Sequence, residues 1–168
     1  VFAVQLAGCR AEDLAHAAEI AEGAGADIID INMGCPAKKV VGGEAGSALM
    51  RDVRHAASLI AATVAAVNVP VSVKMRLGFN AEMRNAPELA ALAQDEGVRL
   101  ITVHGRTRCQ RDQGDADWRA IAETVDAVSV PVVANGDCGS ADDARQMLAA
   151  SGAAGVMVGR AAVGAPWL

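Results

Sequence analysis

Residues 69–106 read VPVSVKMRLGFNAEMRNAPELAALAQDEGVRLITVHGR, and this stretch decides the fold. Its two ends, 69–76 and 99–106, are short, nearly continuous apolar runs, which are typical of parallel strands buried on both faces. Between them, residues 86–97 (APELAALAQDEG) place apolar side chains at helical spacing and stop at a glycine. A strand, a helix and a second strand in this order predict parallel strands joined by a right-handed crossover.

The same alternation extends over the whole chain. Strands are predicted at residues 1–8, 26–32, 69–76, 99–106, 130–137 and 155–160, and helices at residues 11–23, 51–67, 86–97, 118–128 and 140–152. The last helix has Ser140 as a candidate N-cap and Gly152 as its stop signal. Repeated strand–helix units indicate an α/β domain with a parallel sheet, either doubly wound or closed into a barrel.

Length favours the barrel. A (β/α)8 TIM barrel takes about 250 residues, or roughly 31 for each unit. The 168 residues of this chain therefore hold about five to six of the eight units, and six strands are predicted. The chain begins at Val1, directly inside a strand pattern. We therefore expect residues 1–168 to be an incomplete TIM-barrel catalytic domain from a longer protein.

Composition limits the class of protein. Hydrophobic residues make up 52% of the chain, so a packed core is expected rather than disorder. No apolar run approaches the roughly 18 residues that a membrane span needs, so no membrane partner is expected. The four cysteines form no CxxC pair and no metal-ligand cluster, which favours reduced thiols in the cytoplasm and no metal site. The net charge of −5 by itself argues mildly against an RNA partner.

Polar side chains follow the apolar part of each strand. They are Gln5, Asn32, Cys35, Lys74, Arg76, His104, Arg106, Asn135, Asp137, Gly159 and Arg160. The carboxyl ends of barrel strands form the active-site face, so we expect these groups to converge on one mouth. The glycine-containing turns ANGD (134–137) and VGR (158–160) lie where barrels commonly bind phosphate through backbone N–H groups.

Three of these residues suggest chemistry, each beside a plainer interpretation. Lys74 ends a buried run, and an unpaired buried ammonium is costly, so it should meet an anion or an electron-rich ring. His104 could bond a phosphate or a carbonyl, or it could be a satisfied structural histidine. Cys35 lies in the turn NMGCP (32–36), which favours a chemical role, whereas most free cysteines are small buried apolar residues. Cys9, Cys109 and Cys138 have no such support.

Five segments, in order, resemble the tRNA-dihydrouridine synthase family of bacteria. They are IIDINMGCPAKKVVGGEAGSALMRD (28–52), VKMRLG (73–78), ITVHGRTR (101–108), VVANGDCGS (132–140) and GVMVGRAAVGAPWL (155–168). The pairing of NMGCP with HGRT is the most specific part of the resemblance, which covers essentially the whole chain.

The resemblance implies a flavin reductase that uses FMN as cofactor and NADPH as reductant. By motif position, Gln5, Lys74 and His104 would contact the flavin; Asn135, Gly136, Asp137, Gly159 and Arg160 would surround its ribityl phosphate; Asn32, Arg76 and Arg106 would face the substrate; and Cys35 would be the catalytic acid. Hydride would pass from N5 of reduced FMN to C6 of a uracil in the D-loop of tRNA, and Cys35 would protonate C5. Free thiols are mostly protonated at neutral pH, so this role suits a cysteine.

The partner implied is tRNA, with its target base flipped out, and the protein is expected to be a monomer. Basic loop residues that could meet tRNA phosphates are Lys38, Lys39, Arg84, Arg106, Arg108 and Arg111. The family's first strand and its C-terminal helical tRNA-binding domain are expected to lie outside this chain. Open alternatives are an FMN barrel acting on a free pyrimidine or small enone, an inactive truncated barrel, and a phosphate-binding barrel lyase without flavin.

Overall fold

A single sheet of six parallel strands organises the protein. The computed structural model describes residues 1–37 and 44–167. The strands follow one another in sequence order, β1-β2-β3-β4-β5-β6, and every neighbouring pair is parallel. They are β1 (Ala3–Leu6), β2 (Ile28–Met33), β3 (Val71–Arg76), β4 (Leu100–His104), β5 (Val132–Asn135) and β6 (Gly155–Met157). All six predicted strands are present, and their sequential order is that of a (β/α) barrel.

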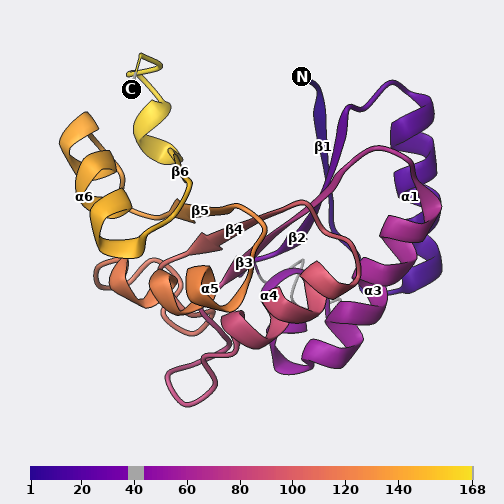
Figure 1. Ribbon diagram of the computed structural model, residues 1–168, viewed down its shortest axis with the longest axis horizontal. Helices are drawn as coiled ribbons and strands as arrows, with labels where there is room; N and C mark the ends of the chain where they lie inside the picture. The colour runs from indigo at the N-terminus through magenta and orange to yellow at the C-terminus, as the bar shows by residue number, and fades with distance from the viewer. Residues whose placement is uncertain (38–43, 168) are drawn as a thin grey trace.

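The helices lie on one face of the curved sheet, in the order in which they occur along the chain (Figure 1). They are α1 (Ala11–Gly23), α3 (Val53–Ala66), α4 (Ala86–Asp95), α5 (Ala122–Ala127) and α6 (Ala141–Ser151), with short 3-10 turns η1 (Gly46–Arg51), η2 (Arg119–Ile121) and η3 (Arg160–Ala162). On the opposite, concave side of the sheet, between β1 and β6, Figure 1 shows none of the helices α1 to α5. The fold is therefore part of a TIM barrel, with its helices outside.

Capping groups set several helix boundaries. The Ser140 hydroxyl accepts a hydrogen bond from the Asp143 amide, and Gly152 ends α6 in the left-handed conformation, as predicted. The predicted helix at 51–67 begins two residues later, at Val53, because the Asp52 carboxylate caps the backbone amides of Arg54 and His55. The predicted helix at 118–128 opens with the 3-10 turn η2 before α5 begins.

Alternate strand residues divide the protein into a core and a polar face. Ile29, Ile31 and Met33 of β2 are fully buried, and Val73 of β3 and Val103 of β4 continue the same apolar layer. Successive side chains of a strand point to opposite faces, so the residues between them lie on the face that carries no helix. In a (β/α) barrel this second face is the interior.

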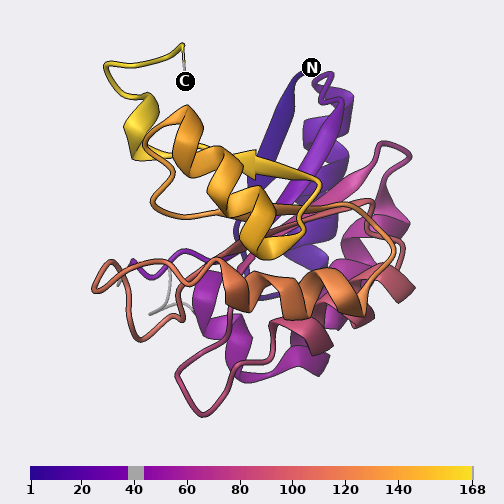
Figure 2. The same ribbon diagram turned by 60° about the vertical axis from the view of Figure 1, so that its left-hand side comes forward.

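The first and last strands have one neighbour each among the described residues. β1 pairs with β2 and β6 pairs with β5, and side chains of both strands are partly or fully exposed. β1 and β6 stand at opposite ends of the sheet, as both views of the ribbon show (Figures 1 and 2). The described part of the chain is thus an open arc of a barrel.

An ion pair between buried Arg106 and partly exposed Asp137 links two loops at the carboxyl ends of the strands. Nη1 and Nη2 of Arg106 donate to the two carboxylate oxygens of Asp137 at 2.9 and 2.6 Å, and the Arg106 side chain is only 4% exposed. Arg106 also donates to the carbonyl oxygens of Gln113 and Gly114. Although burial opposes it, these bonds and one from the Ala116 amide hold the pKa of Asp137 below its ordinary value. The pair therefore joins the β4–α5 loop to the turn after β5.

Replacing Arg106 with glutamine should destabilise the full-length protein by about 3 kcal/mol, toward the lower end for breaking a buried pair because Asp137 is partly exposed. The measurement is urea unfolding followed by circular dichroism. Arg145→Gln is the matched control, because its exposed pair with Asp142 should contribute less than about 1 kcal/mol. Equal unfolding midpoints for the two variants would show that the buried pair does not hold the loops.

Candidate functional site

Strand register arranges the polar side chains of the barrel interior in three rows. The lower row is Gln5, Asp30 and Ser72; the middle row is Asn32, Lys74 and Thr102; the upper row is Arg76, His104 and Asn135. Neighbours in a row are register partners on adjacent strands, and each row lies one pleat nearer the carboxyl ends of the strands. Five residues predicted for the site thus fall into the middle and upper rows, and Gln5 falls into the lower one.

The turn that carries Cys35 is held by side chains at both ends. The side-chain oxygen of Asn32 accepts hydrogen bonds from the amides of Gly34 (3.1 Å) and Cys35 (2.9 Å). The Cys35 carbonyl oxygen accepts from the amide and the hydroxyl of Ser47. Cys35 is a half-buried free thiol. Its backbone is therefore anchored just beyond the end of β2.

Arg76 joins the Cys35 turn to the loop after β4. Its Nε donates to the carbonyl oxygen of Gly34 at 2.8 Å, and its Nη1 donates to the carbonyl oxygens of Thr107 and Arg111. The Arg76 residue is 4% exposed. Most of its hydrogen-bonding capacity is used inside the protein, so a contact with substrate would have to come from the remaining Nη2 edge.

Lys74 lies in the middle row beside groups of both charges. Burial lowers the pKa of Lys74, the nearby Arg76 lowers it further, and Asp30 and Cys35 act in the opposite direction. No salt bridge or hydrogen bond of its ammonium occurs among the described residues. Cys35 and Lys74 therefore share one end of the sheet, and the ammonium is available to a ligand.

His104 is a neutral imidazole that forms no side-chain hydrogen bond among the described residues. Burial lowers its pKa to about 4, with further lowering from Arg76, Lys74 and Arg106. Its Nδ1 is buried and has no hydrogen-bond partner within the described structure. Buried polar atoms are almost always paired in native proteins, so this nitrogen points to a missing partner.

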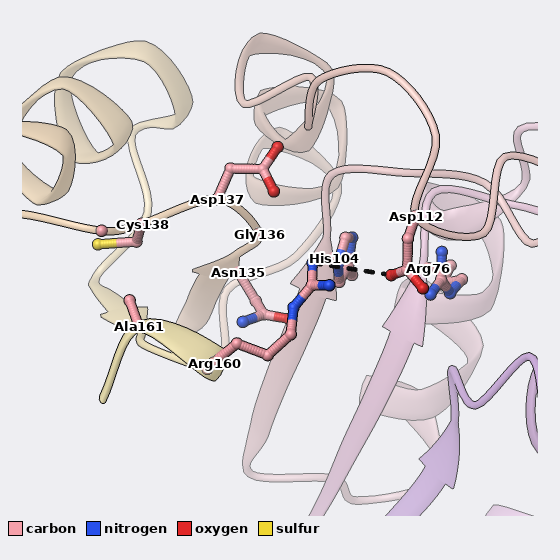
Figure 3. A pocket seen from close by; sticks show the side chains of 11 residues that line it. Arg76, His104, Asp112, Asn135, Gly136, Asp137, Cys138, Arg160 and Ala161 are labelled. Carbon is pink, nitrogen blue, oxygen red and sulfur yellow. Dashed lines mark ion pairs between the residues drawn. The ribbon is translucent and has the colours of Figure 1, made fainter. Parts of the chain in front are cut away.

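The upper row opens into a cavity of about 370 Å³. The predicted residues that line it are Arg76, His104, Asn135, Gly136, Asp137, Gly159 and Arg160, and four further lining residues are Asp112, Cys138, Gly139 and Ala161. In Figure 3 the side chains of Asn135 and Arg160 approach His104 from the side of β5 and β6, whereas the Asp137 carboxylate points away from them. The polar turns predicted to bind phosphate thus do form one hollow.

The turn at Gly136 and a hydrogen bond between β5 and β6 shape that hollow. Gly136 has a φ of +119°, and a Cβ there would come within 2.8 Å of the Ala116 side chain and 3.2 Å of the His104 ring. The Asn135 amide group donates to the carbonyl oxygen of Met157 at 2.8 Å, which links β5 to β6 below the turn. Close approach of the backbone to the imidazole therefore requires glycine at this position.

Arg160 forms an exposed ion pair across the cavity with Asp112, at 3.8 Å (Figure 3). The side chains are 79% and 61% exposed, so the contact is weak and easily exchanged for another anion. Asp112 was not singled out in the sequence, because a loop aspartate carries no pattern that separates it from an ordinary solvated charge.

Five predicted residues lie outside the cavity lining. Gln5, Asn32, Cys35 and Lys74 belong to the β1–β3 side of the same mouth, whereas the cavity lies on the β4–β6 side. Arg106, also predicted at the substrate, donates to Asp137 and to loop carbonyls instead, so contact with a substrate would require one of these bonds to break or its remaining N–H to serve.

The predicted basic loop residues have unequal surroundings. Arg84 is paired with Asp117 at 3.8 Å. The guanidinium groups of Arg51 and Arg108 lie over the ring of Phe79, 4.3 and 5.1 Å from its centroid. Lys38 and Lys39 lie outside the described residues, and Arg111 is exposed. Sequence reasoning missed the Arg51–Phe79–Arg108 stack, because the three residues come from three separate loops.

No group of three or more His, Cys, Asp or Glu side chains in residues 1–37 and 44–167 is arranged to hold a metal ion. None of the described helices combines the length and the apolar character that crossing a bilayer requires.

Similarity to known proteins extends over the whole chain. The family model described as Dihydrouridine synthase (Dus) matches residues 1–168. A "Probable tRNA-dihydrouridine synthase" of Rhodobacter capsulatus is 61% identical over 164 residues, covering 98% of this chain and 51% of the relative. The protein of the same description from Rickettsia conorii is 56% identical, and "tRNA-dihydrouridine synthase B" of Xanthomonas axonopodis pv. citri is 51% identical. They cover 98% and 99% of this chain and 50% of each relative, so the chain spans about half their length.

Solved structures support the fold alone. A mandelate racemase/muconate lactonizing enzyme from Sorangium cellulosum, described as putative, superposes with a TM-score of 0.63 at 20% identity, over 92% of this chain and 37% of that one. A nitroalkane oxidase from Streptomyces ansochromogenes gives a TM-score of 0.52 at 16% identity, over 94% and 49%. The match of the family model to every residue, together with relatives above 50% identity, establishes that the chain belongs to the dihydrouridine synthase family.

Proposed function

We propose that this chain forms the greater part of the catalytic barrel of an enzyme that reduces uridine to 5,6-dihydrouridine in the D-loop of tRNA, with FMN as cofactor and NADPH as reductant. The observation that carries the proposal is the shared mouth: the Cys35 turn, Lys74 and the His104 cavity all lie at the carboxyl ends of neighbouring strands. The relatives' names support the same activity.

The residues at the mouth fit a flavin mononucleotide. Lys74 presents an ammonium that forms no salt bridge or hydrogen bond among the described residues, and His104 presents a buried nitrogen without a partner there, so both can bond the electronegative edge of a flavin ring. The turn at Gly136 leaves backbone close to the cavity, where a Cβ would intrude. Arg160 supplies a planar set of donors suited to the phosphate. Gln5 would reach the ring from the β1 side.

Reduced flavin, when bound, supplies a hydride for C6 of the uracil ring. The protein's part is to hold the base and to complete the reduction with a proton at C5. Cys35 stands at the end of β2 with its backbone tied by Asn32, so its thiol is kept in one place while the base approaches. The neighbouring Arg76 and Lys74 provide positive charge where the base becomes enolate-like, which favours that transition state.

Neutral His104 suits this arrangement better than an imidazolium would. With a pKa of about 4, the ring carries no charge at neutral pH and can donate from one nitrogen while accepting at the other. Three cations already surround it, namely Lys74, Arg76 and Arg106. A positive charge on the imidazole would be repelled by these three cations, and the neutral ring avoids that repulsion.

Local charge supports an RNA partner in spite of the net charge of −5. Arg51 and Arg108, held over Phe79, form no ion pair with a carboxylate among the described residues. Guanidinium groups positioned by an aromatic ring lose little further freedom when they bind a phosphate. The tRNA backbone could therefore be met near the end of β3.

The first test of the proposal uses the full-length protein. It should purify with FMN, show flavin absorbance, and convert uridine to dihydrouridine in tRNA lacking this modification when NADPH is added. Nucleoside mass spectrometry of the tRNA measures the product. If the protein binds flavin and reduces free uracil but not tRNA, its substrate is a small pyrimidine and not tRNA. A colourless protein would contradict the proposed flavin cofactor.

Cys35→Ala should slow the reduction of uridine by about 10²–10⁴-fold, the usual contribution of general acid catalysis. Flavin content and affinity for tRNA should stay close to those of the unchanged protein. The rate is measured in single turnovers after the flavin has been reduced. Cys109→Ala is the control, since Cys109 is an exposed thiol in the loop after β4 rather than in the Cys35 turn, and it should react normally. A fully active Cys35→Ala variant would end the proposed acid role.

His104 should make the protein less stable in mild acid. Its pKa is about 4 in the folded protein against an ordinary 6.5, so between these values the unfolded chain binds more protons and the free energy of unfolding falls as pH falls. Urea unfolding at several pH values between 7 and about 4 measures the slope.

The His104→Gln variant should lose part of that slope, because glutamine does not titrate. His16→Gln is the control for removing a histidine at an exposed position, because the His16 side chain on α1 is 75% exposed. The assignment fails if the His104→Gln and unchanged proteins lose stability in parallel across this pH range.

A further inference from the structure

The lower row of the barrel interior contains a carboxylate that the proposed reaction does not use. Asp30 lies on β2, between Gln5 of β1 and Ser72 of β3. Its Oδ2 accepts from the Gln5 amide nitrogen at 2.6 Å, and its Oδ1 accepts from the Ser72 hydroxyl at 2.6 Å. Neither bond reaches the cavity, although the Asp30 charge also raises the pKa of Lys74 in the row above.

From Asp30 a continuous chain of hydrogen bonds leads to the Cys35 turn. Gln5, held by its nitrogen, presents its Oε1 to the Nδ2 of Asn32 at 2.7 Å. Asn32 in turn presents its Oδ1 to the amides of Gly34 and Cys35. Every donor in this chain faces an acceptor, from the carboxylate at one end to the Cys35 backbone at the other.

The direction of the chain depends on Asp30. The two ends of a side-chain amide have nearly the same shape, so shape alone does not determine which end of Gln5 faces Asn32. A carboxylate has only acceptors and therefore draws the nitrogen of Gln5. If Gln5 were reversed, its oxygen would meet the Asp30 carboxylate and its NH2 group would meet that of Asn32. Both contacts would be repulsive.

We propose that Asp30 is a positioning residue for Cys35: by orienting Gln5, and through it Asn32, it holds the catalytic turn in the geometry that proton transfer requires. This inference rests on the proposed function for its kinetic consequence, but its structural part concerns the turn alone. The proposal gives a role to the lower row, which does not line the cavity. It also explains why a carboxylate lies in the barrel interior without an ion pair among the described residues.

The test uses the full-length protein and two substitutions at one position. Asp30→Val removes both acceptors at similar size, whereas Asp30→Asn keeps one acceptor for Gln5 and can donate its NH2 group to the Ser72 oxygen. Asp27→Val is the matched control, because Asp27 also accepts a hydrogen bond, from the Phe2 amide at 2.7 Å, but lies at the opposite end of β2.

Two readouts are taken. The first is the alkylation rate of each cysteine by iodoacetamide, resolved by peptide mass spectrometry, so that Cys9 and buried Cys138 act as internal references. The second is kcat and KM for tRNA. Asp30→Val should raise alkylation of Cys35 but not of Cys138, and it should lower kcat by about 10–100-fold at unchanged KM, as expected for a misplaced reacting group. Asp30→Asn and Asp27→Val should change neither readout appreciably.

Three results would overturn the inference. In the first, Asp30→Val resembles Asp27→Val in Cys35 alkylation. In the second, Asp30→Asn is as impaired as Asp30→Val, which would make the charge rather than the hydrogen bond responsible. In the third, alkylation of Cys35 and Cys138 rises together, which would indicate general loosening.

Should Asp30→Val fail to fold, Gln5→Leu breaks the same chain one step further along, at an exposed position. It must then raise Cys35 alkylation, and an unchanged rate would overturn the inference. The alkylation result is independent of turnover. A full-length protein that reduces no uridine therefore contradicts the proposed function and leaves the positioning role to be decided by the thiol measurement.

Discussion

In a parallel sheet, side chains in register on neighbouring strands share a face, and all strands end at the same edge. This constraint controls the rest of the structure. It places the apolar residues of each strand against the helices and gathers the polar ones in the barrel interior. The three polar rows follow directly, because a side chain must be two residues further along its strand to reach the next row. Residues as distant in sequence as Asn32 and Asn135 therefore lie on the same face of the sheet.

Hydrogen bonds from buried arginines hold the loops that follow the strands. Arg76 bonds carbonyl groups of two loops, and Arg106 bonds two carbonyls and the Asp137 carboxylate. Irregular backbone leaves many carbonyl oxygens without partners, and a guanidinium can satisfy several at once. Positive charge is thereby concentrated beneath the mouth. Burial lowers the pKa of His104, and this positive charge lowers it further.

The polar network around Asp30 shows a different use of the interior. In the lower row, acceptors and donors are matched in one direction and lead to the Cys35 turn. Matched networks of this kind specify one arrangement of their members, whereas a single reversed amide introduces two repulsions. In the open arc of the barrel, the upper row lines the cavity and the lower row is hydrogen-bonded to the residues above it.

Much of this protein follows from the sequence alone. Continuous apolar runs such as 99–106 predicted the strands, Ser140 and Gly152 predicted the limits of α6, and the polar strand ends predicted the mouth, because these patterns are local and strand direction does the rest. Partners across the fold were decided only by tertiary structure. Arg106 pairs with Asp137, Arg76 bonds loop carbonyls, and Asp30 links to Cys35 through two amides, because long side chains reach whichever acceptor packing brings near. Sequence therefore determined which residues meet at the mouth, and packing determined which of them line the cavity and which are bonded to one another.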